Sequence, residues 1–370
     1  MSNSDNVSGL DPQCINAPPW TWLMLGGKLG DNAQAELVAE SLGWPYQRKN
    51  LVFLEKYQTG KPRFRPTLRH VDLARSSRLG APWPDLIITI GRRPSMAALA
   101  VRKRSGGHSR IVVIGRPRLL SELALGVATP QYSVPQASNV MHLDFPLMRP
   151  DQSRIDKARD ATIASLGRLP RPLTAVLVGG STSPYVLDAG AATRLLSAAR
   201  QACPDGTIYL STSRRTSKEV VERLADDLQP RERLYVWRPD DPENPYLGLL
   251  AHADRIIVTC DSVSMMIEAA RMGKPLAIFE VPARFTVIQK LRRAFARLLD
   301  PTKNRGAGIR HWLYARGLLS YPRDLGRMER ALAARDKAVT LGQPFPPAHD
   351  GVPDESAAVA ARIRALFDPC

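Results

Sequence analysis

A segment near residue 260 combines side chains that would hold a nucleotide. The segment 255–259 has an apolar centre at residues 256–258 and predicts a buried strand. Asp261, Ser262 and Ser264 follow it at the start of the next predicted helix. Unpaired N–H groups and the helix dipole favour a phosphate at such a place. Glu268 follows one turn later, where its carboxylate would accept both hydroxyls of a ribose. We therefore predict a nucleotide site; alternatively, Asp261 or Ser262 only caps the helix and Glu268 is a surface carboxylate.

Two further segments carry groups suited to a diphosphate. Gly180 and Ser181 follow the predicted strand 173–178 and offer N–H groups and a hydroxyl to a phosphate, although a plain tight turn is the alternative. Ser213 and Arg214 follow another predicted strand, and ligands of open parallel sheets bind beyond the carboxyl ends of the strands. Of the two adjacent arginines there, we favour Arg214 as the bidentate donor to the diphosphate.

The first part of the chain opens with a glycine-rich loop of its own. The apolar run 20–25 is followed by Gly26, Gly27, Gly30 and Asp31. The glycines would let an acceptor substrate approach the backbone, and Asp31 is the candidate catalytic base. Asp31 also stands where a helix N-cap belongs, so capping is the alternative. The glycine spacing differs from the dinucleotide fingerprint, which argues against a nicotinamide-dependent epimerase.

Strands and helices alternate along most of the chain and predict parallel sheets covered on both faces. The alternation breaks at a proline-bracketed helix and then restarts. We expect an α/β protein of two Rossmann-like, doubly wound domains facing across a cleft. The expected divisions are a flexible tail (1–18), a first domain on the acceptor side (19–150), a linker (151–170), a second domain on the nucleotide-sugar side (171–345), and a C-terminal tail with a closing helix (346–370).

The charge of the chain indicates an anionic partner. Its 52 Lys and Arg residues exceed its 35 Asp and Glu residues, leaving a net charge of +17. One basic concentration spans residues 61–118, and another runs from Arg284 to Arg316 with helical spacing of its apolar residues. The second would attach to an anionic membrane surface, or else pack its apolar side on its own domain. Sparse aromatic residues argue against nucleic acid as the partner.

Cysteine usage and the first residues point to a reducing compartment. The four cysteines lie far apart and predict neither a disulfide framework nor a zinc site. The first eighteen residues lack the basic and apolar regions of a signal peptide, and no apolar run is long enough to span a bilayer. We expect a cytoplasmic protein, with peripheral attachment to the inner face of a membrane as an open alternative. We expect no cofactor and no metal site, and the oligomeric state is left open.

Four motifs together resemble the mitochondrial-fission ELM-type ("elongated mitochondria") family, whose bacterial members are often labelled nucleoside-diphosphate-sugar epimerases. They are Gly-Gly-Lys-Leu-Gly-Asp-Asn-Ala-Gln at 26–34, Thr-Ser-Arg-Arg-Thr at 212–216, Glu-Asn-Pro-Tyr at 243–246 and Val-Thr-Cys-Asp-Ser-Val-Ser-Met at 258–265. The resemblance covers roughly residues 20–340 and implies a GT-B-like fold. In GT-B glycosyltransferases a Glu at the place of Glu268 contacts the donor ribose.

The functional expectation is a metal-independent glycosyltransferase. It would move a sugar from a nucleoside-diphosphate-sugar to a lipid-linked or envelope acceptor, with the helix dipole and arginine stabilising the leaving diphosphate. The GT-B resemblance leaves the base open, because the lipid-linked N-acetylglucosaminyltransferase of cell-wall synthesis carries a His near the place of Asp31. Two alternatives remain: a catalytically silent protein that binds a membrane surface or a partner, and a nucleotide-sugar epimerase.

Overall fold

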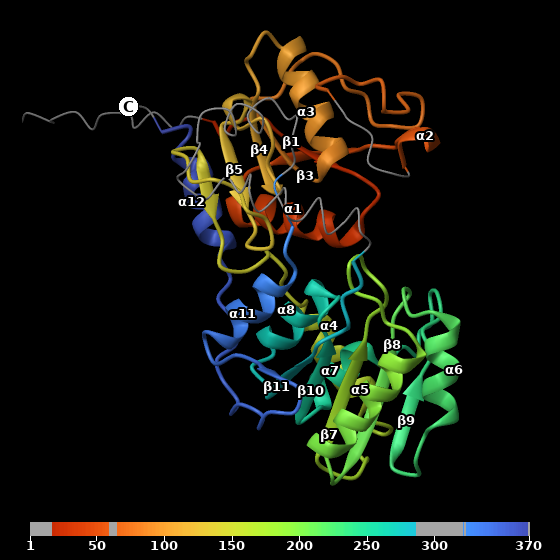
Figure 1. Ribbon diagram of the computed structural model, residues 1–370. Coiled ribbons are helices and arrows are strands. Elements are labelled where there is room, and N and C mark those ends of the chain that lie inside the picture. Colours follow the sequence, from red (N-terminus) through yellow and green to blue (C-terminus); the bar gives the residue numbers. More distant parts are fainter. Residues whose placement is uncertain (1–16, 59–64, 286–320, 322, 369–370) are drawn as a thin grey trace, which may run out of the picture.

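The computed structural model describes residues 17–58, 65–285, 321 and 323–368. Within these residues the chain forms two separate six-stranded sheets in which every neighbouring pair of strands is parallel (Figure 1). Helices lie against each sheet, so the predicted α/β class with two Rossmann-like domains, a GT-B-like architecture, is confirmed.

The first sheet has the spatial order β2-β1-β3-β4-β5-β6. Its strands are β1 (Thr21–Leu25), β2 (Tyr46–Asn50), β3 (Leu86–Ile90), β4 (Arg110–Gly115), β5 (Leu125–Ala128) and β6 (Val140–His142). Its helices are α1 (Leu29–Leu42), α2 (Glu55–Gln58), α3 (Arg92–Arg104), the 3-10 turn η1 (Leu120–Glu122) and α12 (Ser356–Arg364). The side chains of successive strand residues lie on opposite faces of the sheet. On one face, Trp22 and Ile87 pack with α3. On the other face, Leu23 and Ile88 pack with α1 and α12.

The second sheet reads β9-β8-β7-β10-β11-β12, which is the Rossmann order 3-2-1-4-5-6. Its strands are β7 (Leu173–Val178), β8 (Thr207–Thr212), β9 (Glu232–Tyr235), β10 (Arg255–Thr259), β11 (Leu276–Phe279) and β12 (Val339–Thr340). Its helices are α4 (Gln152–Thr162), α5 (Ala189–Ala202), α6 (Lys218–Asp226), α7 (Tyr246–His252), α8 (Val263–Arg271) and α11 (Gly326–Ala333). Residues 151–170, predicted as a linker, contain α4, which packs against α7.

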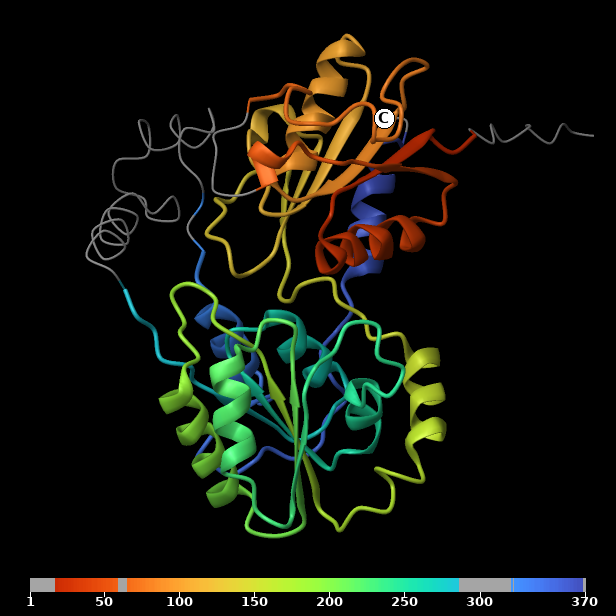
Figure 2. The same cartoon turned by 90° about the vertical axis from the view of Figure 1, so that its right-hand side faces the viewer.

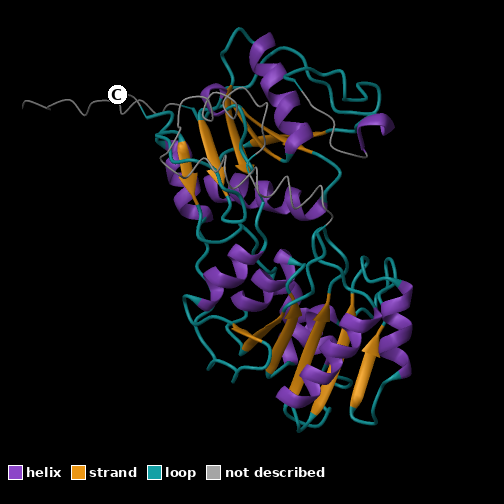
Figure 3. Cartoon of the chain, viewed as in Figure 1, coloured by secondary structure: helices purple, strands orange, loops and turns teal. Residues whose placement is uncertain are grey.

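The carboxyl ends of the strands in each sheet point toward the other domain (Figure 3). In both sheets the strand order reverses at one place, between β1 and β3 in the first and between β7 and β10 in the second. Such a reversal separates the loops that follow the two strands and opens room for a ligand. The glycine loops predicted from the sequence follow β1 and β7, so both lie at these switch points.

The chain passes between the domains more than once. After β6 it enters the second domain, whose core includes Phe145. Near its end it returns, and α12 packs against α1 of the first domain (Figure 2). The two crossings are tied together, because the Glu355 carboxylate accepts hydrogen bonds from the N–H groups of Asp144 (2.9 Å) and Phe145 (3.0 Å). The end of the chain is therefore structurally part of the first domain.

Two expectations fall partly or wholly outside the described part of the chain. Most of the basic segment from Arg284 to Arg316 does so, and only Arg284 and Phe285 are described. Arg284 forms a salt bridge with Asp188 at 2.6 Å. The tail 1–18 is described only from residue 17 onward. Among the helices that the structure describes, none combines the length and apolar character needed to cross a bilayer.

Candidate functional site

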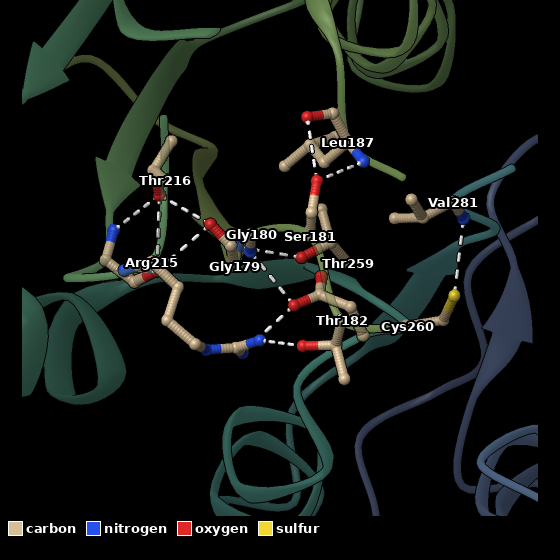
Figure 4. A network of polar contacts seen from close by, with 12 residues as sticks. Gly179, Gly180, Ser181, Thr182, Leu187, Arg215, Thr216, Thr259, Cys260 and Val281 are labelled. Atoms are coloured by element: carbon tan, nitrogen blue, oxygen red, sulfur yellow. Dashed lines mark hydrogen bonds and ion pairs between the residues drawn. The ribbon is translucent and has the colours of Figure 1, made fainter. Parts of the chain in front are cut away.

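The switch point of the second sheet is closed by hydrogen bonds between the loops after β7 and β10 (Figure 4). Gly179 N–H donates to the Thr259 hydroxyl at 2.8 Å, and Gly180 N–H donates to the Asp261 carboxylate at 2.9 Å. A Cβ on Gly179 would stand 2.4 Å from Asp261 Oδ2, and one on Gly180 would stand 2.1 Å from the Arg215 carbonyl oxygen. Glycine is needed here because neighbouring chain comes this close.

These bonds change the predicted role of Gly180 and Ser181. The N–H of Gly180 is used by Asp261, and the Ser181 hydroxyl both donates to the Leu187 carbonyl and accepts from the Leu187 N–H. A backbone donor that is already paired has little to offer an anion. The structure therefore favours the alternative of a tight structural turn over a phosphate cradle at this loop.

Asp261 lies beneath the turn, not at its surface. Its side chain is 0% exposed and forms a salt bridge with Arg215 at 2.9 Å. Burial raises the pKa of the Asp261 carboxyl, while the Gly180 N–H, the Thr259 hydroxyl and the Arg215 guanidinium act in the opposite direction. A carboxylate buried among these groups joins the loops of β7, β8 and β10, and the contact of Asp261 with the nucleotide stays a prediction.

The two adjacent arginines after β8 have different contacts, and the sequence did not indicate this difference. Arg215 reaches back to Asp261 and to the Thr182 hydroxyl. Arg214, which we favoured for the diphosphate, is exposed and takes part in none of the described hydrogen bonds or salt bridges. Ser213 donates its hydroxyl to the Gly179 carbonyl at 3.0 Å and so also joins the loops. Arg214 is the arginine of this pair whose guanidinium remains available to a ligand.

The start of α8 offers unpaired backbone donors at the same switch point. Its N-cap is Ser262, whose hydroxyl makes no capping hydrogen bond. Within the described residues no acceptor pairs with the N–H groups of Val263, Ser264 and Met265. These three donors and the positive end of the helix dipole suit an anion. These N–H groups are the backbone donors expected at the helix start that carries Ser262 and Ser264, and their contact with a phosphate stays a prediction.

Glu268 is held in place by a residue that the sequence analysis did not single out. The Tyr246 hydroxyl, from the first residue of α7, donates to Glu268 Oε2. Burial raises the pKa of the Glu268 carboxyl, and burial together with Glu268 raises the pKa of the Tyr246 phenol. Glu268 and Ser264 are four residues apart on α8 and therefore share one face of the helix. Both are half-buried, so Glu268 does not extend freely into bulk water.

The glycine loop of the first domain differs from its predicted form. Helix α1 already begins at Leu29, so Gly30 and Asp31 belong to its first turn, and the N-cap is Lys28. The alternative role of Asp31 as the N-cap is wrong. The loop is fixed by Asn32, whose side-chain amide donates to the Gly26 carbonyl at 2.8 Å. A Cβ on Gly27 would meet nothing within 4 Å.

Asp31 nevertheless lies at the switch point of its sheet. Its carboxylate is 39% exposed and stands 3.9 Å from Lys28 Nζ. Its Oδ2 atom lies 3.6 Å from the place that a Cβ on Gly91, the residue after β3, would occupy. The carboxylate therefore spans from α1 to the end of β3, in reach of a substrate bound over these strands. The structure leaves its role as a base a prediction.

Two hollows among the described residues lie away from the switch points. One of about 570 Å³ is lined by residues such as Arg255 and Pro275, at the amino ends of β10 and β11. Another of about 420 Å³ includes Arg110 at the amino end of β4. Ligands of doubly wound sheets bind at the opposite, carboxyl ends, so we place neither hollow in the candidate site. In the described part of the chain no group of three or more His, Cys, Asp or Glu side chains is arranged to hold a metal ion.

Comparisons with known proteins agree with the motifs. The "Mitochondrial fission protein ELM1" of Arabidopsis thaliana is 26% identical over 219 residues, which are 53% of this chain and 51% of that protein, so the match spans about half of the relative. The "Uncharacterized protein RP120" of Rickettsia prowazekii (strain Madrid E) is 25% identical over 296 residues, covering 70% of this chain and 83% of that protein.

A solved structure of a UDP-glucosyltransferase from Polygonum tinctorium superposes with a TM-score of 0.44 and 10% identity, covering 96% of this chain and 100% of that one. The model of the family "Mitochondrial fission ELM1" matches residues 29–312, which include Asp31, the switch point of the second sheet, Arg214 and the whole of α8. The chain belongs to the Mitochondrial fission ELM1 family.

Proposed function

We propose that this protein is a cytoplasmic, metal-independent glycosyltransferase that takes a sugar from a nucleoside-diphosphate-sugar and transfers it to a lipid-linked or envelope acceptor. One observation carries the proposal: α8 presents three unpaired N–H groups in its first turn and, on the same face one turn later, a carboxylate oriented by Tyr246. A diphosphate and a ribose are separated by a similar short distance. This face of α8 would therefore bind both parts of the donor.

Each group has a separate task in the proposed reaction. The N–H groups of residues 263–265 and the guanidinium of Arg214 hold the diphosphate, and Glu268 accepts hydrogen bonds from the ribose hydroxyls. Asp31 takes the proton of the acceptor hydroxyl while that oxygen bonds to the anomeric carbon. The bond between this carbon and the diphosphate oxygen breaks at the same time. The helix dipole and Arg214 stabilise the negative charge that develops on the leaving group.

Nucleotide binding is the first test, by thermal shift and calorimetry with uridine, guanosine, adenosine, cytidine and thymidine diphosphates. A diphosphate that binds the native state raises its melting temperature, and the best one reports the base. Glu268→Gln should weaken that binding about tenfold or more, since a hydrogen bond to a charged group contributes about 1.5–3 kcal/mol. The control is Glu222→Gln, which alters an exposed carboxylate of α6. Equal affinity of Glu268→Gln and the parent protein would remove the assignment.

An assay of nucleotide-sugar turnover distinguishes the three functional alternatives. Purified protein is mixed with the nucleotide-sugar that binds best, with and without extracted lipid acceptors, and the products are analysed by mass spectrometry. Release of nucleoside diphosphate that depends on the acceptor supports transfer, and Asp31→Asn should then slow it without loss of donor affinity. A changed sugar still attached to the nucleotide would indicate epimerisation. Binding without any turnover would favour the silent, partner-binding alternative.

A further inference from the structure

Arginines gather at the carboxyl edge of the first sheet, opposite the nucleotide site. The neighbouring strands β3 and β4 lead into glycines with positive φ: Gly91 (86°) directly follows β3, and Gly115 (90°) is the last residue of β4. Each glycine is followed directly by an arginine, Arg92 and Arg116. Because the strands pair residue for residue, the two arginines begin side by side. Arg118 follows two residues after Arg116 and joins them.

The guanidinium groups of this cluster act on one another. Burial, together with the charges of Arg116 and Arg92, lowers the pKa of Arg118 to about 10, with Tyr321 acting in the opposite direction. Burial and the charge of Arg93 likewise lower the pKa of Arg92. Among the described residues no carboxylate forms a salt bridge with Arg118. The cluster therefore concentrates half-buried positive charge at a cost to folding.

Packing keeps this charge in place. The Arg116 guanidinium donates to the Tyr321 carbonyl and lies over the Tyr132 ring, 5.1 Å from its centroid. Tyr321 itself is 2% exposed and packs in the core of the first domain. Arg92 is the first residue of α3, where the positive end of the helix dipole disfavours a cation. A bound anion would relieve the repulsion among these groups and the conflict with the dipole together.

We propose that Arg92, Arg116 and Arg118 form a binding site for a phosphate group in the first domain. Guanidinium forks bind phosphate oxygens in pairs, and three of them match the two or more negative charges of a phosphate ester or diphosphate better than a single carboxylate. Gly91, which precedes Arg92, also neighbours Asp31. The bound phosphate would thus lie near the proposed base. Its assignment to the acceptor substrate rests on the proposed function, whereas the anion site itself does not.

Calorimetry of the full chain with inorganic pyrophosphate tests the site. Arg118→Gln should weaken binding about tenfold or more, because it removes a charge-assisted pair of hydrogen bonds. The control is Arg104→Gln, an exposed position at the far end of α3, which should bind as the parent protein does. Without anion, Arg118→Gln should also melt at a higher temperature than the parent, since it relieves repulsion. Unchanged affinity of Arg118→Gln for pyrophosphate and for both of the phosphate esters described next would overturn the proposal.

Two further arms identify the source of the phosphate. Sedimentation with phosphatidylcholine vesicles that contain phosphatidic acid tests a lipid headgroup, and titration with glycerol 3-phosphate tests a soluble ester. Binding that is lost in Arg118→Gln in either arm supports the site and names the source. Absence of arginine-dependent binding in both arms and with pyrophosphate refutes it.

The outcome is distinguishable from that of the proposed function. Arg118→Gln should leave nucleoside diphosphate binding to the second domain unchanged, and Glu268→Gln should leave arginine-dependent phosphate binding unchanged. If nucleotides fail to bind while the arginine-dependent site persists, the proposed function is wrong and the anion site stands. If nucleotides bind and Arg118→Gln has no effect on any phosphate probe, only the anion site is wrong.

Discussion

The carboxyl edges of the two sheets face each other but differ in how their polar and charged groups are paired. In the second domain, loops from β7, β8 and β10 are bound to one another through Asp261, Gly180 and Arg215, and most of their polar groups are satisfied internally. In the first domain, Arg92 and Arg118 bring like charges together. A preformed, internally bonded surface suits a ligand whose shape is constant, whereas concentrated charge suits a ligand recognised by its phosphate. In the proposed transfer reaction, specificity for donor and acceptor would therefore be built by different physical means.

The largest effect should come from filling the space between the joined loops. Gly180→Ala would place a methyl group 2.1 Å from the Arg215 carbonyl oxygen, so the loops must separate. We expect a loss of about 3 kcal/mol in the free energy of unfolding, measured by urea denaturation. Gly27→Ala in the first domain, where nothing lies within 4 Å, is the control and should cost less than about 1 kcal/mol. Similar losses in the free energy of unfolding for both variants would show that the two loops do not differ in the space around their glycines.

A smaller effect should separate the two arginines after β8. Arg215→Gln leaves the buried Asp261 carboxylate without its cation, and because Arg215 is 38% exposed we expect a loss of about 2 kcal/mol, below the range for fully buried pairs. Arg214→Gln should change stability by less than about 0.5 kcal/mol but should weaken nucleoside diphosphate binding. Thermal denaturation of both variants measures the change in stability, and calorimetry measures their affinity for the nucleoside diphosphate. The reverse pattern would show that the structural and ligand-binding roles are exchanged.

The smallest effect concerns pH at the same edge. Burial raises the pKa of the Glu329 carboxyl to about 7, with Glu280 acting in the same direction and Arg330 against it. The native state holds this proton more tightly than the unfolded chain does. Protonation of Glu329 therefore contributes fully to the free energy of unfolding below pH 4.5, and this contribution is lost as the pH rises through 7. The melting temperature should fall by about 2–4 °C between pH 5 and 8, and by less in Glu329→Gln. An identical pH profile in that variant would contradict the assignment, and Glu222→Gln serves as the control.

Apolar patterning predicted most of the fold. Strands β7 and β10 were located to the residue, because both are apolar runs bounded by polar loops. Strand β2 (Tyr46–Asn50) lacks the apolar signal that locates a strand in a sequence, because it is an edge strand with a polar sequence. Helix α1 begins two residues before Asp31, which capping preferences could not reveal because its N-cap is a lysine.

The candidate site was predictable in position but not in detail. Strand ends, glycines and helix starts locate the switch points from the sequence alone. Which of two adjacent arginines turns inward depends on a carboxylate 46 positions away, and no local pattern reports that pairing. The same holds for Tyr246, which contacts Glu268 only because α7 and α8 flank the same sheet. The Glu-Asn-Pro-Tyr motif at 243–246 was the available signal for it.

The return of α12 to the first domain has a consequence for biosynthesis. The apolar surface of α1 that faces α12 has no cover while the ribosome is still making the second domain. Val359, Ala360 and Ile363 supply that cover and are translated after the strands of the second domain. The first domain would thus complete its packing only after the second domain has been made, and a polypeptide ending at residue 150 should expose this strip and aggregate.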